Sequence, residues 1–334
     1  MTDPAIHIEG IEQKPFHLTP GDDAAFESLA STIMTFQREA NPVYRRLEGF
    51  TYLPVEAFKM TPIAAFDTAR AERVFVSSGT GSQIRSRHYV RKVSLYEHSV
   101  LAGYDLAITQ RFGWSDRDPV ILAHLPAYAE ESSLVYMVRT LINRRGAPGS
   151  GFFLDDREGL ASAIEGARER SHPILLFGAA FGLLDLLEER EWPLPPGSVV
   201  IETGGMKTHR REVKRSALHH VLRKGFAVPA SHVVSEYGMC ELMSQCYTDD
   251  KGIFRTPPWM RFKVLDPADG ATPLPVGEEG VLALLDLANI YTVSAILTAD
   301  RAREVDGGFT IHGRLSSSEL RGCNFLIDGS PPGT

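Results

Sequence analysis

Short apolar runs alternate with amphipathic, helix-like stretches along most of this chain, and this alternation constrains the fold more than any other feature. The strand-like runs lie at 73–77, 119–124, 174–177, 199–202 and 231–237. Apolar runs of this length, separated by helical patterns, are typical of strands buried in a sheet that helices cover. The sequence therefore predicts an α/β fold with helix-covered sheets.

The residue pattern of the sequence changes after Trp259. Short strand-like runs are separated there by turn signals such as Asp-Pro-Ala-Asp-Gly at 266–270. We expect an α/β core over residues 1–255 and a smaller β-rich lobe over residues 256–334, which is either separate or part of the same domain.

Two helix starts carry capping patterns. Thr19, which a proline follows, is predicted to be the N-cap of a helix that ends near Ala40. Ser94 and Glu97 have the spacing of a capping box at the start of another helix.

Composition excludes several classes of protein. The 35 basic and 42 acidic side chains give a net charge of −7, so no sequence-wide positive field attracts nucleic acid or an anionic membrane. No segment approaches the roughly 18 apolar residues of a membrane span, and the N-terminus lacks the pattern of a leader peptide. The three cysteines have no Cys-X-X-Cys spacing, which argues against a disulfide framework or a structural zinc site. We therefore expect a cytoplasmic protein.

A loop rich in glycine and hydroxyl side chains follows the first strand-like run. Its residues are Ser77, Ser78, Gly79, Thr80, Gly81 and Ser82. Glycines let backbone N–H groups approach a phosphate, and hydroxyls add further donors. The loop lacks the Gly-Lys-Ser/Thr ending of a P-loop and runs into a strand, which weighs against a kinase or GTPase. An ordinary hairpin turn is the alternative interpretation.

A second candidate, Tyr237-Gly238-Met239-Cys240-Glu241, follows an apolar strand, where α/β proteins usually place their ligand sites. The aromatic ring of Tyr237 can stack on a purine, and Glu241 can bind Mg²⁺ when phosphates supply the other ligands. Equally, Tyr237 fits a core position and Glu241 a solvated helix.

A third candidate combines Thr298-Ala299-Asp300 with Gly313-Arg314 and a later Cys323. A carboxylate can accept hydrogen bonds from two ribose hydroxyls, and an arginine can neutralise phosphate. A thiol can accept an activated acyl group. The alternatives are a β-turn with surface charges for the first two motifs and a buried, inert thiol for Cys323.

The order of these motifs resembles that of the adenylate-forming, acyl-CoA synthetase-like superfamily. Four segments are more specifically similar to the LuxE-type acyl-protein synthetases over residues 15 to 325: Ser77–Ser82, Glu202–Lys207, Tyr237–Leu242 and Glu319–Cys323. The resemblance implies the fold of the superfamily's N-terminal domain and the formation of an acyl-AMP from ATP, with Mg²⁺, before transfer to a thiol.

The resemblance also implies roles for individual residues. Glu241 would bind Mg²⁺, Asp300 the ribose, and Arg314 would lie near the phosphate or ribose, while Cys323 would carry the acyl group as a thioester. The remaining ATP contacts would come from the glycine loop and from Gly204, Gly205, Tyr237 and Gly238.

Two departures from the superfamily pattern stand out. Cys240 occupies the position where a threonine commonly precedes the glutamate, and only 11 residues follow Cys323, so we expect the separate C-terminal domain with its catalytic lysine to be absent. Lys207 is a hypothetical replacement that would stabilise the developing phosphate charge; a solvated lysine is the alternative.

Several functional alternatives remain at the level of sequence. The acyl group can pass instead to coenzyme A, a carrier protein or an amine, with Cys323 idle, or the chain can be a catalytically silent nucleotide- or acyl-binding domain. The resemblance implies a fatty acid, although an aromatic or amino acid also fits, and an acyl reductase or carrier protein as the acceptor. A metal hydrolase is disfavoured because the 11 histidines show no His-Glu-X-X-His spacing.

Overall fold

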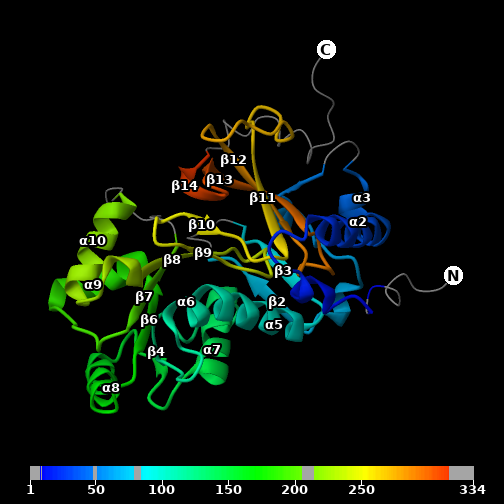
Figure 1. Cartoon of the computed structure of the whole chain (residues 1–334). Helices are drawn as coiled ribbons and strands as arrows, with labels where there is room; N and C mark the ends of the chain where they lie inside the picture. The colour runs from blue at the N-terminus through cyan, green and yellow to red at the C-terminus, as the bar shows by residue number, and fades with distance from the viewer. Residues whose placement is uncertain (1–7, 9, 48–50, 79–83, 205–213, 316–334) are drawn as a thin grey trace. The chain divides into compact units, whose positions relative to one another are not determined.

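The computed structural model forms two compact units. Unit 1 contains the described residues of Met1–Ser99, Met239–Ser244 and Arg255–Thr334, and unit 2 those of Val100–Gly238 and Gln245–Phe254. The described residues from Arg255 onward thus group with the N-terminal part of the chain. The structure describes residues 8, 10–47, 51–78, 84–204 and 214–315 (Figure 1).

Unit 2 is built on a sheet in the order β9-β8-β7-β6-β4-β5. All its neighbouring strands run parallel except β9, which is antiparallel to β8. Their bounds are β4 (Val120–His124), β5 (Gly151–Phe152), β6 (Ile174–Ala179), β7 (Val199–Thr203), β8 (Val233–Tyr237) and β9 (Cys246–Thr248). The strands expected at 119–124, 174–177, 199–202 and 231–237 are confirmed to within two residues.

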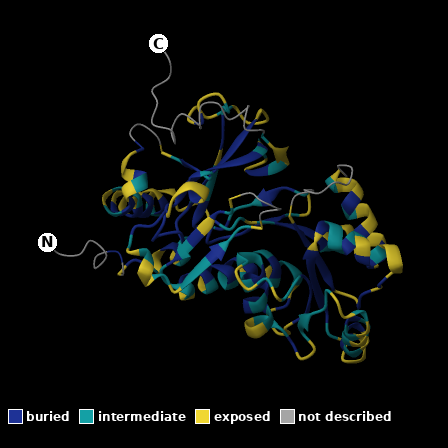
Figure 2. Ribbon diagram, turned by 180° about the vertical axis from the view of Figure 1, so that it is seen from behind, coloured by how far each residue is buried: buried dark blue, intermediate teal, exposed yellow. Residues whose placement is uncertain are grey.

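Helices precede and connect the parallel strands of unit 2. They are the π-helix η3 (Asp105–Thr109), α6 (Gln110–Phe112), α7 (Ser133–Arg145), α8 (Arg157–Glu169), α9 (Ala180–Glu189), α10 (Arg215–Gly225) and the 3₁₀-helix η4 (Ala230–His232). Leu176 and Val200 from the sheet pack with Leu160, Leu183 and Leu222 from α8, α9 and α10 in one apolar core. Figure 2 shows the strands as buried and these helices as exposed on their outer sides.

Unit 1 contains an antiparallel sheet in the order β11-β12-β13-β14, with β1 parallel to β13. A separate antiparallel pair is formed by β2 and β3. The bounds are β1 (Leu53–Pro54), β2 (Arg73–Val76), β3 (Arg87–Val90), β11 (Met260–Leu265), β12 (Glu279–Asp286), β13 (Ala295–Val305) and β14 (Gly308–Arg314), while β10 (Phe254–Arg255) lies where the chain passes between the units. The β-rich pattern expected after Trp259 is confirmed.

The helices of unit 1 come mostly from the N-terminal part of the chain. They are η1 (Lys14–His17), α2 (Asp23–Ala40), α3 (Pro42–Arg45), α4 (Ala57–Met60), η2 (Thr68–Arg70) and α5 (Val93–Tyr104), the last of which ends in unit 2. In the ranges that the structure describes, no helix combines the length and the apolar character needed to cross a bilayer.

Both predicted helix caps are wrong. The N-cap of α2 is Asp22, whose carboxylate accepts a hydrogen bond from the backbone N–H of Ala25 at 3.1 Å, so Thr19 lies outside the helix. Helix α5 already includes Val93, whose N–H donates to the Glu72 carboxylate at 2.8 Å. A carboxylate from a distant segment therefore takes the role that the capping box assigned to Ser94.

Candidate active site

Among the predicted site residues of unit 1 that the structure describes, Glu241 is the most deeply buried, with 5% of its surface exposed. Burial raises the pKa of its carboxyl group, while a hydrogen bond with Ser86 and the positive charges of Arg314 and Lys59 act in the opposite direction. Burial thus removes much of the hydration of the carboxyl group, and one hydroxyl and two positive charges partly compensate for it. A bound cation would offset that loss.

Arg314 also pairs with Asp300. The two residues lie opposite each other on β14 and β13, and the Arg314 Nε–H donates to the Asp300 carboxylate at 3.1 Å. Thr298 ties this part of β13 to β12, because its hydroxyl donates to the Leu282 carbonyl and accepts from the Asp300 N–H. The structure therefore pairs the predicted residues Asp300 and Arg314 directly, and the positive charge of Arg314 also acts on the Glu241 carboxyl group.

The glycine loop is closed at its base by two serines. The Ser77 N–H donates to the Ser86 carbonyl at 3.1 Å, and the Ser86 N–H donates to the Ser77 hydroxyl at 2.9 Å. Ser86 is also the hydrogen-bond partner of Glu241, so the base of the loop contacts this carboxyl group. Ser78 is exposed, and residues 79–83, which include Gly79, Thr80, Gly81 and Ser82, lie outside the described residues.

Two residues that sequence reasoning missed hold the backbone on either side of Glu241. His88 on β3 is fully buried, and burial lowers its pKa to about 4, so the imidazole is neutral. Its Nδ1 lies 2.8 Å from the Cys240 carbonyl, which only accepts, so Nδ1 carries the proton. The Asn289 amide donates to the Glu241 carbonyl at 2.9 Å.

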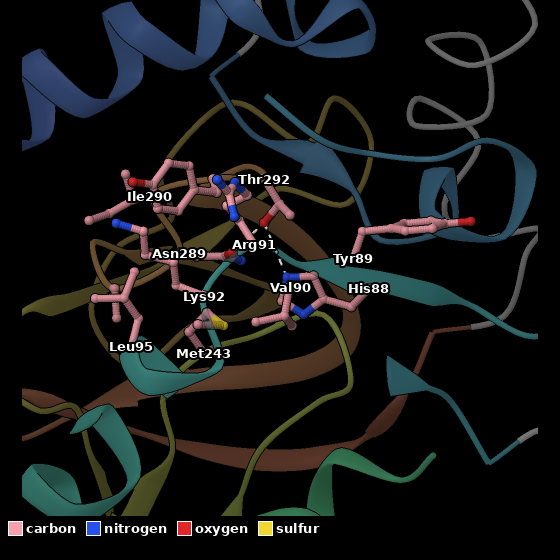
Figure 3. Close-up of a pocket in the computed structure, with 12 residues that line it drawn as sticks. His88, Tyr89, Val90, Arg91, Lys92, Leu95, Met243, Asn289, Ile290 and Thr292 are labelled. Atoms are coloured by element: carbon pink, nitrogen blue, oxygen red, sulfur yellow. Dashed lines mark hydrogen bonds between the residues drawn. The ribbon is translucent and has the colours of Figure 1, made fainter. Parts of the chain in front are cut away.

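Figure 3 shows His88, Asn289 and Thr292 gathered in this region. Nε2 of His88 lies 3.2 Å from the Thr292 hydroxyl, which in turn donates to the Asn289 side chain. The cavity that they line has a volume of about 10 Å³, enough for at most one water molecule. This region is therefore a packed support for the Cys240–Glu241 backbone.

Replacing His88 with phenylalanine tests this support. If Glu241 binds Mg²⁺, loss of the hydrogen bond to Cys240 is expected to raise the Mg²⁺ concentration needed for half-maximal activity by about 10-fold, because Glu241 then loses its fixed orientation. His88→Asn, whose amide nitrogen can replace Nδ1, is expected to recover part of that loss. The measurement is a Mg²⁺ titration of carboxylate-dependent ATP–pyrophosphate exchange.

His232 offers a matched control in unit 2. Its Nδ1 also lies 2.8 Å from a backbone carbonyl, that of Ser198. His232→Phe is expected to lower stability by about 1–3 kcal/mol, as His88→Phe does, without changing the Mg²⁺ requirement. Equal shifts in both variants would show that His88 has only a structural role.

The predicted residues of unit 2 lie at the carboxyl ends of β7 and β8. Gly204 directly follows β7 with φ of +90°, a conformation that favours glycine. Tyr237 ends β8 and is half-buried, with its ring edge-on to Phe254 at 5.8 Å between centroids, and Gly238 follows it in an exposed position. Gly205 and Lys207 lie outside the described residues.

A polar network at the same strand ends was not predicted. Glu202 is buried and accepts a hydrogen bond from the Ser235 hydroxyl. His219 and Arg215 from α10 approach the same carboxylate at 3.3 Å and 3.6 Å. The sequence carried a signal for a polar site here, since Glu202 is a single acidic residue near the end of an apolar strand. Its partners could not be predicted, because they depend on how α10 packs against the sheet.

The described residues fit a magnesium ion held mainly by phosphate. Within the described ranges, no three histidine, cysteine or acidic side chains are grouped to hold a metal ion. One buried carboxylate, Glu241, with the Ser86 hydroxyl beside it, suits Mg²⁺, which commonly uses one or two carboxylates and takes its other ligands from water and substrate phosphates. Of the cysteines, Cys240 and Cys246 are not part of a disulfide, and Cys323 lies outside the described residues.

Comparisons with known proteins give matches in structure only. No family model and no curated protein sequence matches this chain. A structure of 2-hydroxyisobutyryl-CoA ligase with 2-HIB-AMP and CoA is 13% identical, with a TM-score of 0.61 over 90% of this chain and 77% of that one. McyG A-PCP complexed with phenylalanyl-adenylate is 14% identical, with a TM-score of 0.53 over 76% of this chain and 48% of that one.

The amide bond synthetase McbA from Marinactinospora thermotolerans is 15% identical, with a TM-score of 0.50. The match covers 74% of this chain and 50% of that one, so this chain spans about half the length of McyG A-PCP and of McbA. The predicted fold class is confirmed: this chain has the α/β fold of adenylate-forming ligases.

Proposed function

We propose that this chain activates a carboxylic acid with ATP, forming an acyl-adenylate and pyrophosphate. The observation that carries the proposal is the group formed by Glu241, Asp300 and Arg314. It combines a carboxylate suited to a divalent cation with an acid–arginine pair suited to ribose and phosphate. The shared fold supports the same chemistry, because two of the compared structures hold an acyl-AMP or aminoacyl-AMP.

In the proposed reaction, a carboxylate oxygen of the substrate attacks the α-phosphorus of ATP. The bond from that phosphorus to the bridging oxygen breaks, and the electron pair leaves with pyrophosphate. Asp300 would accept hydrogen bonds from the ribose hydroxyls, and Arg314 would offset phosphate charge. Mg²⁺, held by Glu241, would screen the negative charge that otherwise repels the attacking carboxylate.

The proposed acyl acceptor is a thiol, as in the LuxE-type enzymes. The Cys323 thiolate would attack the acyl carbonyl and release AMP, and the thioester would then pass to a partner protein such as an acyl reductase or carrier protein. Transfer to coenzyme A, a carrier protein or an amine is the second candidate, which the named activities of the compared ligases favour. A silent binding domain is the third candidate.

Carboxylate-dependent ATP–pyrophosphate exchange tests the activation step. A panel of fatty, aromatic and amino acids is incubated with the protein, ATP, Mg²⁺ and labelled pyrophosphate, and label entering ATP is measured. The proposal predicts exchange with at least one class of acid. Bound nucleotide without exchange for any acid would contradict it and favour the silent domain.

Lys207 is the proposed source of positive charge for the developing phosphate. Lys207→Ala is expected to lower the kcat of exchange by about 10-fold or more with little change in the KM for ATP, since the charge would act in the transition state. Lys214→Ala removes an exposed lysine seven positions later and is the matched control. An unchanged kcat in Lys207→Ala would disprove the role.

A further inference from the structure

A second buried carboxyl group lies at the strand ends of unit 2, on the face opposite Glu202. Glu236 has 6% of its surface exposed and is the neighbour of Thr203 in the pairing of β8 with β7. The Thr203 hydroxyl donates to its carboxylate. Side chains alternate between the faces of a strand, which separates Glu236 from the network of Glu202 and Ser235.

The two acids differ in their countercharges. Glu202 has Arg215 and His219 within 3.6 Å, whereas no cation among the described residues stabilises Glu236. Burial and the nearby charge of Glu202 raise the pKa of Glu236 to about 7, with the Thr203 hydrogen bond acting against them. An ionised carboxylate accepts up to about four hydrogen bonds, so one hydroxyl leaves most of its capacity unused.

Gln245 supplies a second acceptor on the same face. It directly precedes β9, whose pairing with β8 places Tyr247 opposite Glu236 and Cys246 opposite Tyr237, so Gln245 follows opposite Gly238. Gln245 is 6% exposed, and within the described structure its carbonyl oxygen Oε1 is buried without a hydrogen-bond partner. A buried, unpaired carbonyl is costly unless a donor reaches it.

Gly238 lets the two side chains approach the same point. A Cβ atom on Gly238 would lie 2.5 Å from Oε1 of Glu236 and 3.5 Å from Cγ of Gln245. The Glu236 carboxylate therefore occupies space that any other residue at 238 would fill. This point lies at the carboxyl ends of β7 and β8, the edge where parallel sheets place their ligands, and three residues before Glu241 in the chain.

We infer that the carboxylic acid substrate carries a protonated amino group, which binds between the Glu236 carboxylate and the Gln245 carbonyl. The inference rests on the proposed function. An ammonium group has three donors and a positive charge, so it satisfies both acceptors and neutralises the acid that lacks a countercharge. A hydroxyl group would satisfy one acceptor and leave the charge uncompensated, and an unsubstituted fatty acid would leave both unpaired.

Pairs of acids that differ only in the amino group test the inference in ATP–pyrophosphate exchange. Suitable pairs are phenylalanine and phenylpropanoate, leucine and methylpentanoate, aminomethylbenzoate and methylbenzoate, and aminooctanoate and octanoate. At least one amino-bearing acid is expected to have a kcat/KM about 100-fold or more above that of its partner, because a site built to bind a polar group rejects the analogue that lacks it.

Glu236→Gln and Gln245→Leu identify the residues responsible. Both variants are expected to lose most of the discrimination, mainly through a lower kcat/KM for the amino-bearing acid, and far-UV circular dichroism provides the folding control. The amino acid should bind more tightly to wild type as pH rises from about 6 to about 8, since Glu236 ionises over this range, and Glu236→Gln should remove that dependence.

The outcomes separate the inference from the proposed function. Exchange that is equal for both members of every pair, or that favours the des-amino acids, would overturn the inference and leave acid activation intact. If both variants still discriminate between the two members of a pair as wild type does, the inference would also be overturned, since other residues would then recognise the amino group. Absence of exchange with every acid would instead refute the proposed function.

Discussion

The Glu241→Gln substitution is expected to lower the rate of carboxylate-dependent ATP–pyrophosphate exchange by about 10²- to 10³-fold. This is the usual cost of removing one group that stabilises transition-state charge. The amide keeps the size of the side chain but lacks the charge that would hold Mg²⁺ in the proposed site. The loss should appear mainly as a reduced kcat and a higher Mg²⁺ requirement, measured by titrating Mg²⁺ at saturating ATP and acid.

The same substitution is expected to leave the protein as stable as before, or more so. The folded protein raises the pKa of the Glu241 carboxyl, so ionised Glu241 opposes folding at neutral pH and a neutral amide removes that cost. Thermal unfolding therefore distinguishes a catalytic role from a structural one. A Glu241→Gln protein that unfolds at a lower temperature and keeps its exchange activity would contradict the assignment.

The Cys323→Ser substitution is expected to abolish the hydroxylamine-sensitive acyl-enzyme while leaving pyrophosphate exchange unchanged. In the proposed reaction the thiolate attacks the acyl-adenylate after pyrophosphate has formed, so its loss would block only the second step. A serine hydroxyl is almost entirely protonated at neutral pH and is a much weaker nucleophile. The measurement is retention of radiolabelled acyl group on precipitated protein, with and without hydroxylamine.

The buried Cys246 provides the control for that experiment. Cys246→Ala removes a free thiol of β9 and is expected to keep the acyl-enzyme. A labile acyl group that persists in Cys323→Ser would disprove the thioester assignment. Acyl transfer to coenzyme A or an amine in that variant, at the rate of wild type, would favour the free-standing ligase.

The strand ends of the candidate site could be predicted because apolar runs and the polar residues after them are local signals. Asp300 and Arg314 were expected from short motifs and not from strand ends, and the antiparallel pairing of β13 with β14 places them opposite each other. The strand pattern thus predicted the fold class, whereas the roles expected of Glu241, Asp300 and Arg314 came from the resemblance to the adenylate-forming superfamily.

The supporting residues could not be predicted in the same way. His88 reaches Cys240 across a separation of 152 residues and Asn289 reaches Glu241 across 48, so their roles depend on how distant strands pack. Strand register was needed to place Glu236 and Gln245 on one face, because a shift of one residue would separate them. The helix caps failed for a related reason, since Glu72 on a distant segment competes with the local signal at Ser94.

The central claim, formation of an acyl-adenylate, is tested most directly with a carboxylic acid labelled with heavy oxygen in its carboxylate. Attack of that carboxylate on the α-phosphorus, followed by transfer of the acyl group to a thiol or to hydroxylamine, leaves one labelled oxygen in AMP, which mass spectrometry detects. We expect labelled AMP and unlabelled pyrophosphate. Label in inorganic phosphate with formation of ADP, or unlabelled AMP, would contradict the account.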